Sequence, residues 1–248
     1  MRNYELEFKN RVEFIKNMLE KTKATGIVFG NSGGKDSALV GILCKATCEN
    51  TVGIIMPCCS QRNFGEDMDD GKELSQQFNI ETRVVDLTDV KNKELEVLEN
   101  VTTITDAASA NIAPRLRMIT LYTIAASENR IVAGTGNRSE AYMGYFTKWG
   151  DGAYDFNPIA DLTATEVFEF LRYLNAPSSI IEKAPSAGLF EGQTDEKEMG
   201  VTYKAIDKYI TEGKGEPEDV ETINRYHLRN LHKRKMPEVY ACFEEDLK

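Results

Sequence analysis

The chain has 248 residues, of which 41% are hydrophobic and 28% charged, and its formal net charge is -10. This length is near the upper size of a single domain, and the composition is that of an ordinary globular protein. The negative charge argues against a general nucleic-acid surface, which needs a basic face, although it leaves room for a local basic pocket.

Targeting and redox signals are weak. No apolar stretch approaches the length of a membrane span, and the N-terminus is too charged for a signal peptide, so we expect a cytoplasmic protein without membrane contact. The five cysteines are odd in number and form no CxxC pair, which favours free thiols over disulfides or a zinc site.

Apolar runs alternate with amphipathic segments through the first half of the chain. Residues 2–22 carry apolar side chains at mixed three- and four-residue spacing, which predicts a helix. Short β-branched runs predict strands at 25–30, 51–57, 82–87 and 131–136. Helices are expected between them at 36–48, 66–78 and 107–129.

This alternation predicts an α/β fold, a doubly wound parallel sheet flanked by helices. After Asp161 the strand signals fade, and we expect helices at 164–175, 201–212 and 217–235 with a mobile polar loop at 184–200. We therefore predict a single domain, 1–248, with a core of about 24–175 and a helical C-terminal extension of about 176–248.

Polar segments follow three of the predicted strands: 30–37, 58–70 and 134–140. Parallel sheets bind ligands at the carboxyl ends of their strands, so these segments should face one crevice.

The segment GNSGGKDSALV, residues 30–40, has the form of a phosphate-binding turn between a strand and a helix. Gly33 and Gly34 let the backbone approach an anion, Ser32 and Ser37 offer hydroxyls, and the helix dipole favours negative charge. Neither the P-loop pattern nor the G-x-G-x-x-G dinucleotide pattern fits these residues.

The distinctive residue in this turn is Asp36, whose carboxylate would repel a bare phosphate. It is compatible with phosphate if a divalent cation lies between them, as Mg²⁺ does when carboxylates and substrate phosphates share it. The plainer interpretation is a strand–helix turn with Asp36 as a cap. Six small or polar residues in one turn make that interpretation the less favoured one.

At this point two resemblances become specific. SGGKDS, residues 32–37, resembles the signature loop of the ATP pyrophosphatase superfamily, which cleaves ATP between the α- and β-phosphates. Residues 111–122, 134–167 and 231–237 resemble, in order, segments of the ammonia-dependent NAD synthetases. This resemblance implies a carbon–nitrogen ligase that uses ATP, Mg²⁺ and ammonia to convert deamido-NAD into NAD, AMP and pyrophosphate through an acyl adenylate.

The resemblance also implies roles for individual residues. It implies that ATP is bound by Gly30, Asn31, Ser32, Gly33, Gly34, Lys35, Asp36, Ser37, Thr135 and Ser186. It implies that deamido-NAD is bound by Arg115, Lys148, Asp155, His232 and Lys233. Asp36 and Glu140 are the implied Mg²⁺ ligands, and our catalytic candidates are Asp36 and, as acceptor of the ammonium proton, Asp151.

Several of these residues can also be interpreted without a functional role. Arg115 on its own is typical of a solvated helix face, and Lys148 with Asp155 could form a surface ion pair of small energetic value. Two departures from the family pattern also matter: Ala164 stands where the family usually has a lysine, and Ile55 where it often has an arginine. Lys35 and Arg62 are candidates to replace the missing positive charge.

Two rival functions remain open at this point. A tRNA-modifying thiolase of the same superfamily would need a basic RNA surface, which the net charge of -10 opposes. A nucleotide-binding module that has lost catalysis would explain Ala164 and Ile55. The family further implies a homodimer, with 2–22 and 111–129 as possible contact surfaces. We expect free ammonia, or ammonia from a separate partner, because these residues include no second domain that would release it from glutamine.

Overall fold

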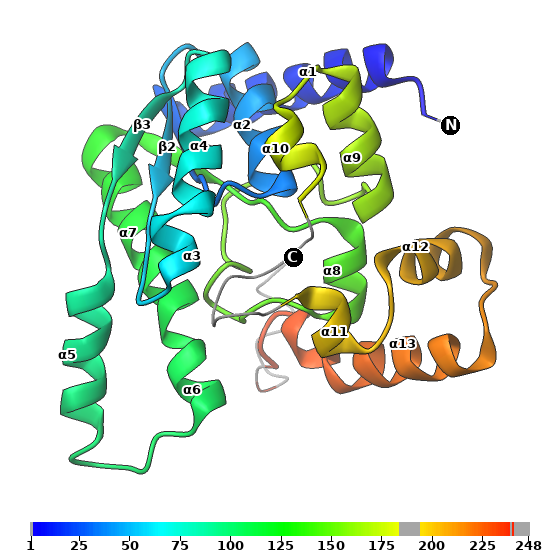
Figure 1. Ribbon diagram of the computed structural model, residues 1–248. Coiled ribbons are helices and arrows are strands. Elements are labelled where there is room, and N and C mark those ends of the chain that lie inside the picture. The colour runs from blue at the N-terminus through cyan, green and yellow to red at the C-terminus, as the bar shows by residue number, and fades with distance from the viewer. Residues whose placement is uncertain (1, 184–193, 239, 241–248) are drawn as a thin grey trace.

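The computed structural model describes residues 2–183, 194–238 and 240, apart from the side chains at 61 and 62. Its centre is a parallel sheet with the strand order β3-β2-β1-β4 (Figure 1). The strands are β1 (Gly26–Gly30), β2 (Thr51–Ile55), β3 (Glu81–Val84) and β4 (Arg130–Ala133). All four strands expected from the β-branched runs are therefore present, and the parallel sheet is confirmed.

Helices connect and cover these strands. In the first half they are α1 (Tyr4–Thr22), α2 (Lys35–Thr47), α3 (Gln61–Phe64), α4 (Glu66–Gln77), α5 (Thr88–Leu98), α6 (Asp106–Ala110) and α7 (Ile112–Glu128). After β4 they are α8 (Arg138–Met143), α9 (Ala164–Tyr173), α10 (Ser178–Ile181), α11 (Asp195–Met199), α12 (Tyr203–Glu212) and α13 (Pro217–Arg229), then a 3₁₀ turn at Leu231–Lys233.

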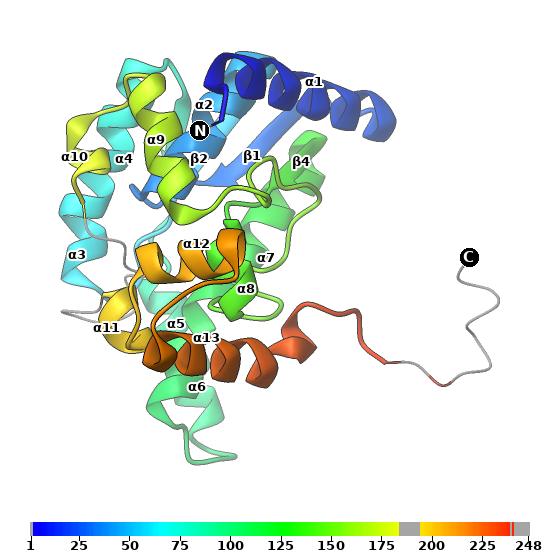
Figure 2. The same cartoon turned by 90° about the vertical axis from the view of Figure 1, so that its right-hand side faces the viewer.

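The connections place helices on both faces of the sheet. The chain runs from β1 to β2 to β3 in one direction and then returns through α5–α7 to β4, on the other side of β1. Side chains alternate along β1, so Ile27 and Phe29 pack toward α1, α2 and α9. Val28 packs on the opposite face, toward α7 (Figures 1 and 2). The doubly wound fold class is thus confirmed.

The C-terminal helices are present and share a small core with the preceding part of the chain. Met199, Ile206 and Ile223, from α11, α12 and α13, pack against Met143 of α8 and Ala164 of α9. Figure 2 shows α11, α12 and α13 grouped beneath α9 and around α8. The helix α8 therefore precedes the predicted extension in sequence but packs with it. The division into a core and an extension remains a prediction.

The structure differs from the sequence-based expectation in three segments. The helix expected at 107–129 is divided, because α6 ends at Ala110 and α7 begins at Ile112, with Pro114 in the first turn where its missing N–H is harmless. Of the loop expected at 184–200, residues 195–199 form α11, and 184–193 lie outside the described residues. The helix α5 was not expected, because Val90 and Val97 are about half exposed and give it no marked apolar face.

Membrane insertion receives no support from the described part of the chain. None of its helices combines the length and the apolar character that crossing a bilayer requires.

Candidate active site

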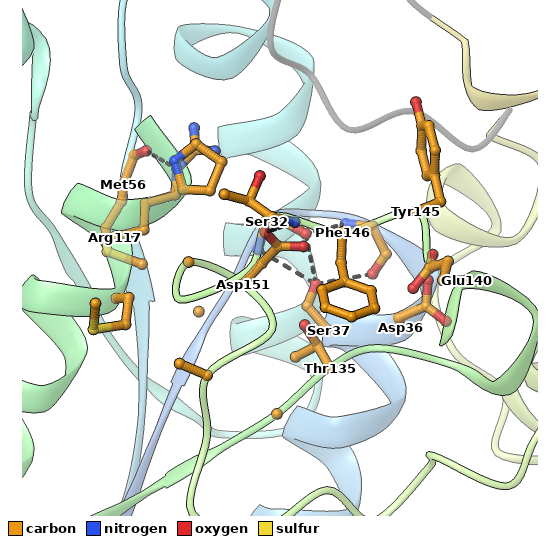
Figure 3. A pocket seen from close by; sticks show the side chains of 18 of the residues that line it. Ser32, Asp36, Ser37, Met56, Arg117, Thr135, Glu140, Tyr145, Phe146 and Asp151 are labelled. Atoms are coloured by element: carbon orange, nitrogen blue, oxygen red, sulfur yellow. Dashed lines mark hydrogen bonds between the residues drawn. The ribbon is translucent and has the colours of Figure 1, made fainter. Parts of the chain in front are cut away.

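A cavity of about 570 Å³ lies at the carboxyl ends of the strands, beside the neighbouring strands β1 and β4. The connection from β1 to β2 runs through α2 on one face of the sheet, whereas the connection that enters β4 runs through α7 on the other face. Doubly wound sheets bind ligands at such a position. All three polar segments expected at strand ends contribute to the lining, with residues from 30–37, from 58–70 and from 134–140. Figure 3 shows the side chains that converge there.

The turn at 30–37, which the sequence predicts to bind phosphate, is shaped by Gly33 and anchored by Asn31. Gly33 has a φ of +70°, and a Cβ added there would lie 2.1 Å from the backbone oxygen of Asp67, so only glycine fits without displacement. Asn31 is part of the cavity lining, and its buried side chain donates to the backbone oxygen of Gly71 at 2.9 Å. Asn31 thereby fixes the turn against α4.

The hydroxyls of Ser32 and Ser37 lie 3.0 Å apart just inside this turn. The Ser37 hydroxyl donates to the backbone oxygen of Gly34, where α2 begins. The turn therefore presents hydroxyls and the N-terminus of a 13-residue helix to the cavity, an arrangement that attracts anions.

Two carboxylates from separate elements, Asp36 of α2 and Glu140 of α8, lie next to each other (Figure 3). Asn137 is bonded to both residues and holds them in place. The Asn137 amide donates to Asp36 Oδ1 at 3.0 Å, and its side-chain oxygen accepts the backbone N–H of Glu140 at 3.0 Å. Glu140 Oε2 in turn accepts the backbone N–H of Asn137, which completes a capping box. The sequence reasoning missed Asn137, although the Asn-x-x-Glu spacing that signals such a box was present.

Lys35 lies against this carboxylate pair. Its Nζ donates to Asp36 Oδ2 at 2.6 Å and lies 3.9 Å from Glu140 Oε1. Burial by itself would lower the pKa of Lys35, but Asp36 and Glu140 outweigh it and raise that pKa above its ordinary value. Burial, and then the charge of Asp36, raise the pKa of Glu140 well above its usual range, although Lys35 acts to lower it.

The pair has the donor chemistry for one hard divalent cation. Both carboxylates are within reach of a single ammonium nitrogen, and their side chains are 14% and 19% exposed toward the cavity. Among the residues described, no group of three or more His, Cys, Asp and Glu side chains could hold a metal alone. Two carboxylates completed by substrate phosphates are what Mg²⁺ commonly uses.

Asp151 and Arg117 form another part of the lining. Asp151 Oδ1 accepts the backbone N–H of Thr147 at 2.9 Å. The surface of Asp151 is exposed to solvent in the cavity, but many protein atoms surround its carboxylate. The resulting desolvation raises the pKa of Asp151. Arg117 donates to the backbone oxygen of Met56 and to Asn63 Oδ1, each at 3.1 Å. Sequence reasoning selected Arg115, whereas it is Arg117 that lines the cavity.

The residues expected to contact the dinucleotide fall into three places. Lys233 lines the cavity and donates to the backbone oxygens of Gly144 and Phe146, at 2.8 Å each. Arg115, Lys148 and His232 lie beside the cavity and are linked through Lys148. Arg115 donates to the Lys148 backbone oxygen at 3.4 Å, and Lys148 Nζ donates to that of His232 at 3.0 Å.

Asp155 stands apart from that group. Its carboxylate accepts the backbone N–H of Val132 at 2.7 Å and the hydroxyl of Tyr122 at 3.2 Å. Thr135 lines the cavity, and Ser186 lies outside the described residues. Of the two departures from the family pattern, Ile55 lines the cavity, whereas Ala164 is buried at the first position of α9.

Comparison with known families matches residues 7–239 of this chain to NAD synthase. The chain belongs to the NAD synthase family. The resemblance drawn from the motifs is thereby confirmed. The chain is 48% identical over 240 residues to the NH(3)-dependent NAD(+) synthetase of Carboxydothermus hydrogenoformans, covering 96% of this chain and 98% of that protein.

Solved structures agree with this assignment. The fold of this chain has a TM-score of 0.92 and 38% identity to the NMN synthetase of Francisella tularensis, covering 97% of this chain and 100% of that one. The NH3-dependent NAD synthetase of Campylobacter jejuni gives a TM-score of 0.80 at 28% identity, with coverage of 97% and 100%. The carbon–nitrogen ligase class expected from the motifs is therefore the class of its relatives.

Proposed function

We propose that this protein amidates deamido-NAD with ammonia at the expense of ATP, giving NAD, AMP and pyrophosphate. The observation that carries the proposal is the convergence of the phosphate-binding turn, Asp36 and Glu140 on one cavity at the ends of β1 and β4. In a member of the NAD synthase family, this convergence supplies the groups needed to activate a carboxylate with ATP.

The first step joins the nicotinate carboxylate to AMP. A carboxylate oxygen attacks the α-phosphorus, the bond to the bridging oxygen of the β-phosphate breaks, and pyrophosphate leaves with that electron pair. The backbone N–H groups of the turn and the hydroxyls of Ser32 and Ser37 hold the departing phosphates. Asp36 and Glu140 would hold Mg²⁺, which would neutralise charge on the phosphates. Thr135 lies in the same lining, and we propose that it contacts ATP.

The second step replaces AMP by ammonia. Ammonia attacks the acyl carbon, the carbon–oxygen bond to AMP breaks, and one proton must leave the nitrogen. Asp151 is the proposed acceptor of a proton from ammonium or from the attacking nitrogen, because it faces the cavity and burial raises its pKa above the ordinary value. Lys233 and Arg117 balance its charge.

Substrate recognition is proposed to extend from Lys233 inside the cavity to Arg115, Lys148 and His232 at its side. Arginine and lysine donors suit the pyrophosphate of a dinucleotide. Asp155 accepts two hydrogen bonds at the end of β4 and thereby fixes that strand end. Contact with the substrate is a second proposed role of Asp155. Replacing Lys233 or Lys148 with Met should therefore raise KM for deamido-NAD more than KM for ATP.

The decisive experiment is mass spectrometry of the products formed from ATP, deamido-NAD and ammonium chloride. Equal amounts of NAD, AMP and pyrophosphate are expected, with little product when glutamine replaces ammonium. ATP binding without AMP release would instead identify a nucleotide-binding module. ADP in place of AMP would contradict the adenylate.

A second candidate substrate is nicotinate mononucleotide, and the 0.92 TM-score to the Francisella tularensis NMN synthetase favours testing it. The chemistry at the carboxylate is the same for both substrates. They differ only in what is attached to the phosphate of the nicotinate ribose. The 48% identity to an NAD synthetase supports the dinucleotide. Parallel kcat/KM measurements decide between the two, and a higher value for the mononucleotide would replace our assignment.

We also propose a homodimer. Val90 and Val97 of α5 and Ile119 of α7 are half or more exposed, and α5 packs beside α7. Apolar side chains clustered on a surface favour an association between subunits. Light scattering after size-exclusion chromatography tests this, and a mass near the chain's 27.9 kDa would contradict it.

A further inference from the structure

Lys35 has surroundings that are unusual for a lysine in a phosphate-binding turn. Its side chain is 5% exposed, and its Nζ lies 2.6 Å from Asp36 Oδ2 and 3.9 Å from Glu140 Oε1. The same Nζ lies 5.2 Å from the ring centre of Tyr203 and 5.7 Å from that of Phe168. The ammonium is thus enclosed by two carboxylates and two aromatic rings.

A further carboxylate contributes to this enclosure from α11. Asp195 accepts the Tyr203 hydroxyl at 2.9 Å, and its negative charge favours the protonated form of Lys35. The strongest partner of Lys35 remains Asp36, which is one of the two proposed Mg²⁺ ligands. An ammonium in direct contact with Asp36 and close to Glu140 repels a divalent cation that approaches the same oxygens.

We propose that in the free enzyme the Lys35 ammonium occupies the cation position beside Asp36 and Glu140, and that it leaves this position when the nucleotide and its metal bind. The proposal rests on the assignment of Asp36 and Glu140 as the metal pair. Without nucleotide, Lys35 offsets part of the negative charge of the two carboxylates and competes with divalent cations. With nucleotide, the displaced ammonium is at the N-terminus of α2, where phosphate oxygens accept its hydrogen bonds.

This arrangement makes an unusual prediction for a substitution that removes a positive charge. Lys35→Met should bind Mn²⁺ at least tenfold more tightly than the wild type in the absence of nucleotide, because the competing ammonium is gone. Lys35→Arg should bind Mn²⁺ about as weakly as the wild type, because it keeps the charge. Lys45→Met, a change on the same helix at a lysine that pairs with Glu49, is the matched control and should leave Mn²⁺ affinity unchanged.

The measurement is a titration of each variant with Mn²⁺, followed by the electron paramagnetic resonance signal of the free ion. Asp36→Asn added to Lys35→Met should abolish the gained affinity, which would assign it to this pair. Equal or weaker Mn²⁺ binding by Lys35→Met would overturn the proposal, as would a gain that survives Asp36→Asn.

A second readout covers the case in which Lys35→Met does not fold. In the wild type, a non-hydrolysable ATP analogue should tighten Mn²⁺ binding at least tenfold, and Lys35→Gln should reduce that synergy. Synergy that is unchanged in Lys35→Gln would also overturn the proposal. These Mn²⁺ affinities do not depend on which carboxylate substrate is amidated, so failure of the proposed function in the product assay remains a separate result.

Discussion

Replacing Asp207 with alanine should destabilise the protein strongly, although Asp207 lies outside the cavity lining. The carboxylate of this buried residue of α12 accepts hydrogen bonds from the hydroxyl of Ser139 and from the backbone N–H of Thr165, the latter at 2.8 Å. It thereby joins α12 to α8 and to the first turn of α9.

The size of the effect follows from these two contacts. A hydrogen bond to a charged group contributes about 1.5–3 kcal/mol, and removing the acceptor leaves the buried Ser139 hydroxyl and the part-buried Thr165 N–H without this partner. We expect Asp207→Ala to lower the free energy of unfolding by about 3–5 kcal/mol. For a chain of this length that corresponds to a fall in Tm of roughly 6–20 °C. Asp207→Asn keeps one acceptor oxygen and should lose about half as much.

Urea unfolding followed by circular dichroism measures this difference, and Lys208→Ala on the exposed side of the same helix is the control, expected within about 0.5 kcal/mol of the wild type. Ser139 precedes Glu140, so the folded Asp207→Ala protein should also lose activity. A destabilisation below about 1 kcal/mol would refute the assignment of Asp207 as a buried hydrogen-bond acceptor that links three helices.

Four further outcomes follow from the site. Gly33→Ala forces a left-handed residue that costs about 1–2 kcal/mol and displaces Asp67, so KM for ATP should rise at least tenfold; an unchanged ATP titration would contradict the turn's role. Asp36→Asn should abolish pyrophosphate release while the circular dichroism spectrum and Tm stay near those of the wild type, and unchanged turnover would remove the metal assignment. The base that we propose is the deprotonated form of Asp151, so turnover should decline as pH falls through a pKa above the ordinary value of about 4. This decline should vanish in Asp151→Asn, which we expect to be roughly a hundredfold slower. Iodoacetamide should modify the exposed Cys59 before Cys58, because burial raises the pKa of Cys58 to about 11; peptide mapping that finds Cys58 first would contradict its burial.

The fold could be predicted from sequence because each strand is a short, β-branched run that ends at glycine or polar residues. Those signals are local, so β1, β2, β3 and β4 were all found. The break between α6 and α7 was not, because the apolar pattern continues across Asn111. Local pattern also cannot place α8 against α12 and α13, since that packing joins residues more than sixty positions apart.

The site was predictable where motifs are contiguous and less so where contacts are long-range. The turn at 30–37 and the spacing to Glu140 were visible in the sequence. The link from Asn137 to Asp36 spans 101 positions, and nothing in either segment alone indicates it. Arg115 and Arg117 are two residues apart on α7 and therefore point in different directions, so only the fold could show that Arg117 reaches the cavity.

The packing of α8 also has a consequence for the order in which a newly made chain matures. The sheet is complete once β4 ends at Ala133, but the core that holds α8, and with it Glu140, includes side chains as late as Ile223. At a synthesis rate of roughly 5–20 residues per second, several seconds separate those two points on the ribosome. A nascent chain can thus fold its sheet while Glu140, one of the two carboxylates proposed to hold the metal, has no fixed position. We therefore expect ATP turnover to start only after the last helices have left the exit tunnel.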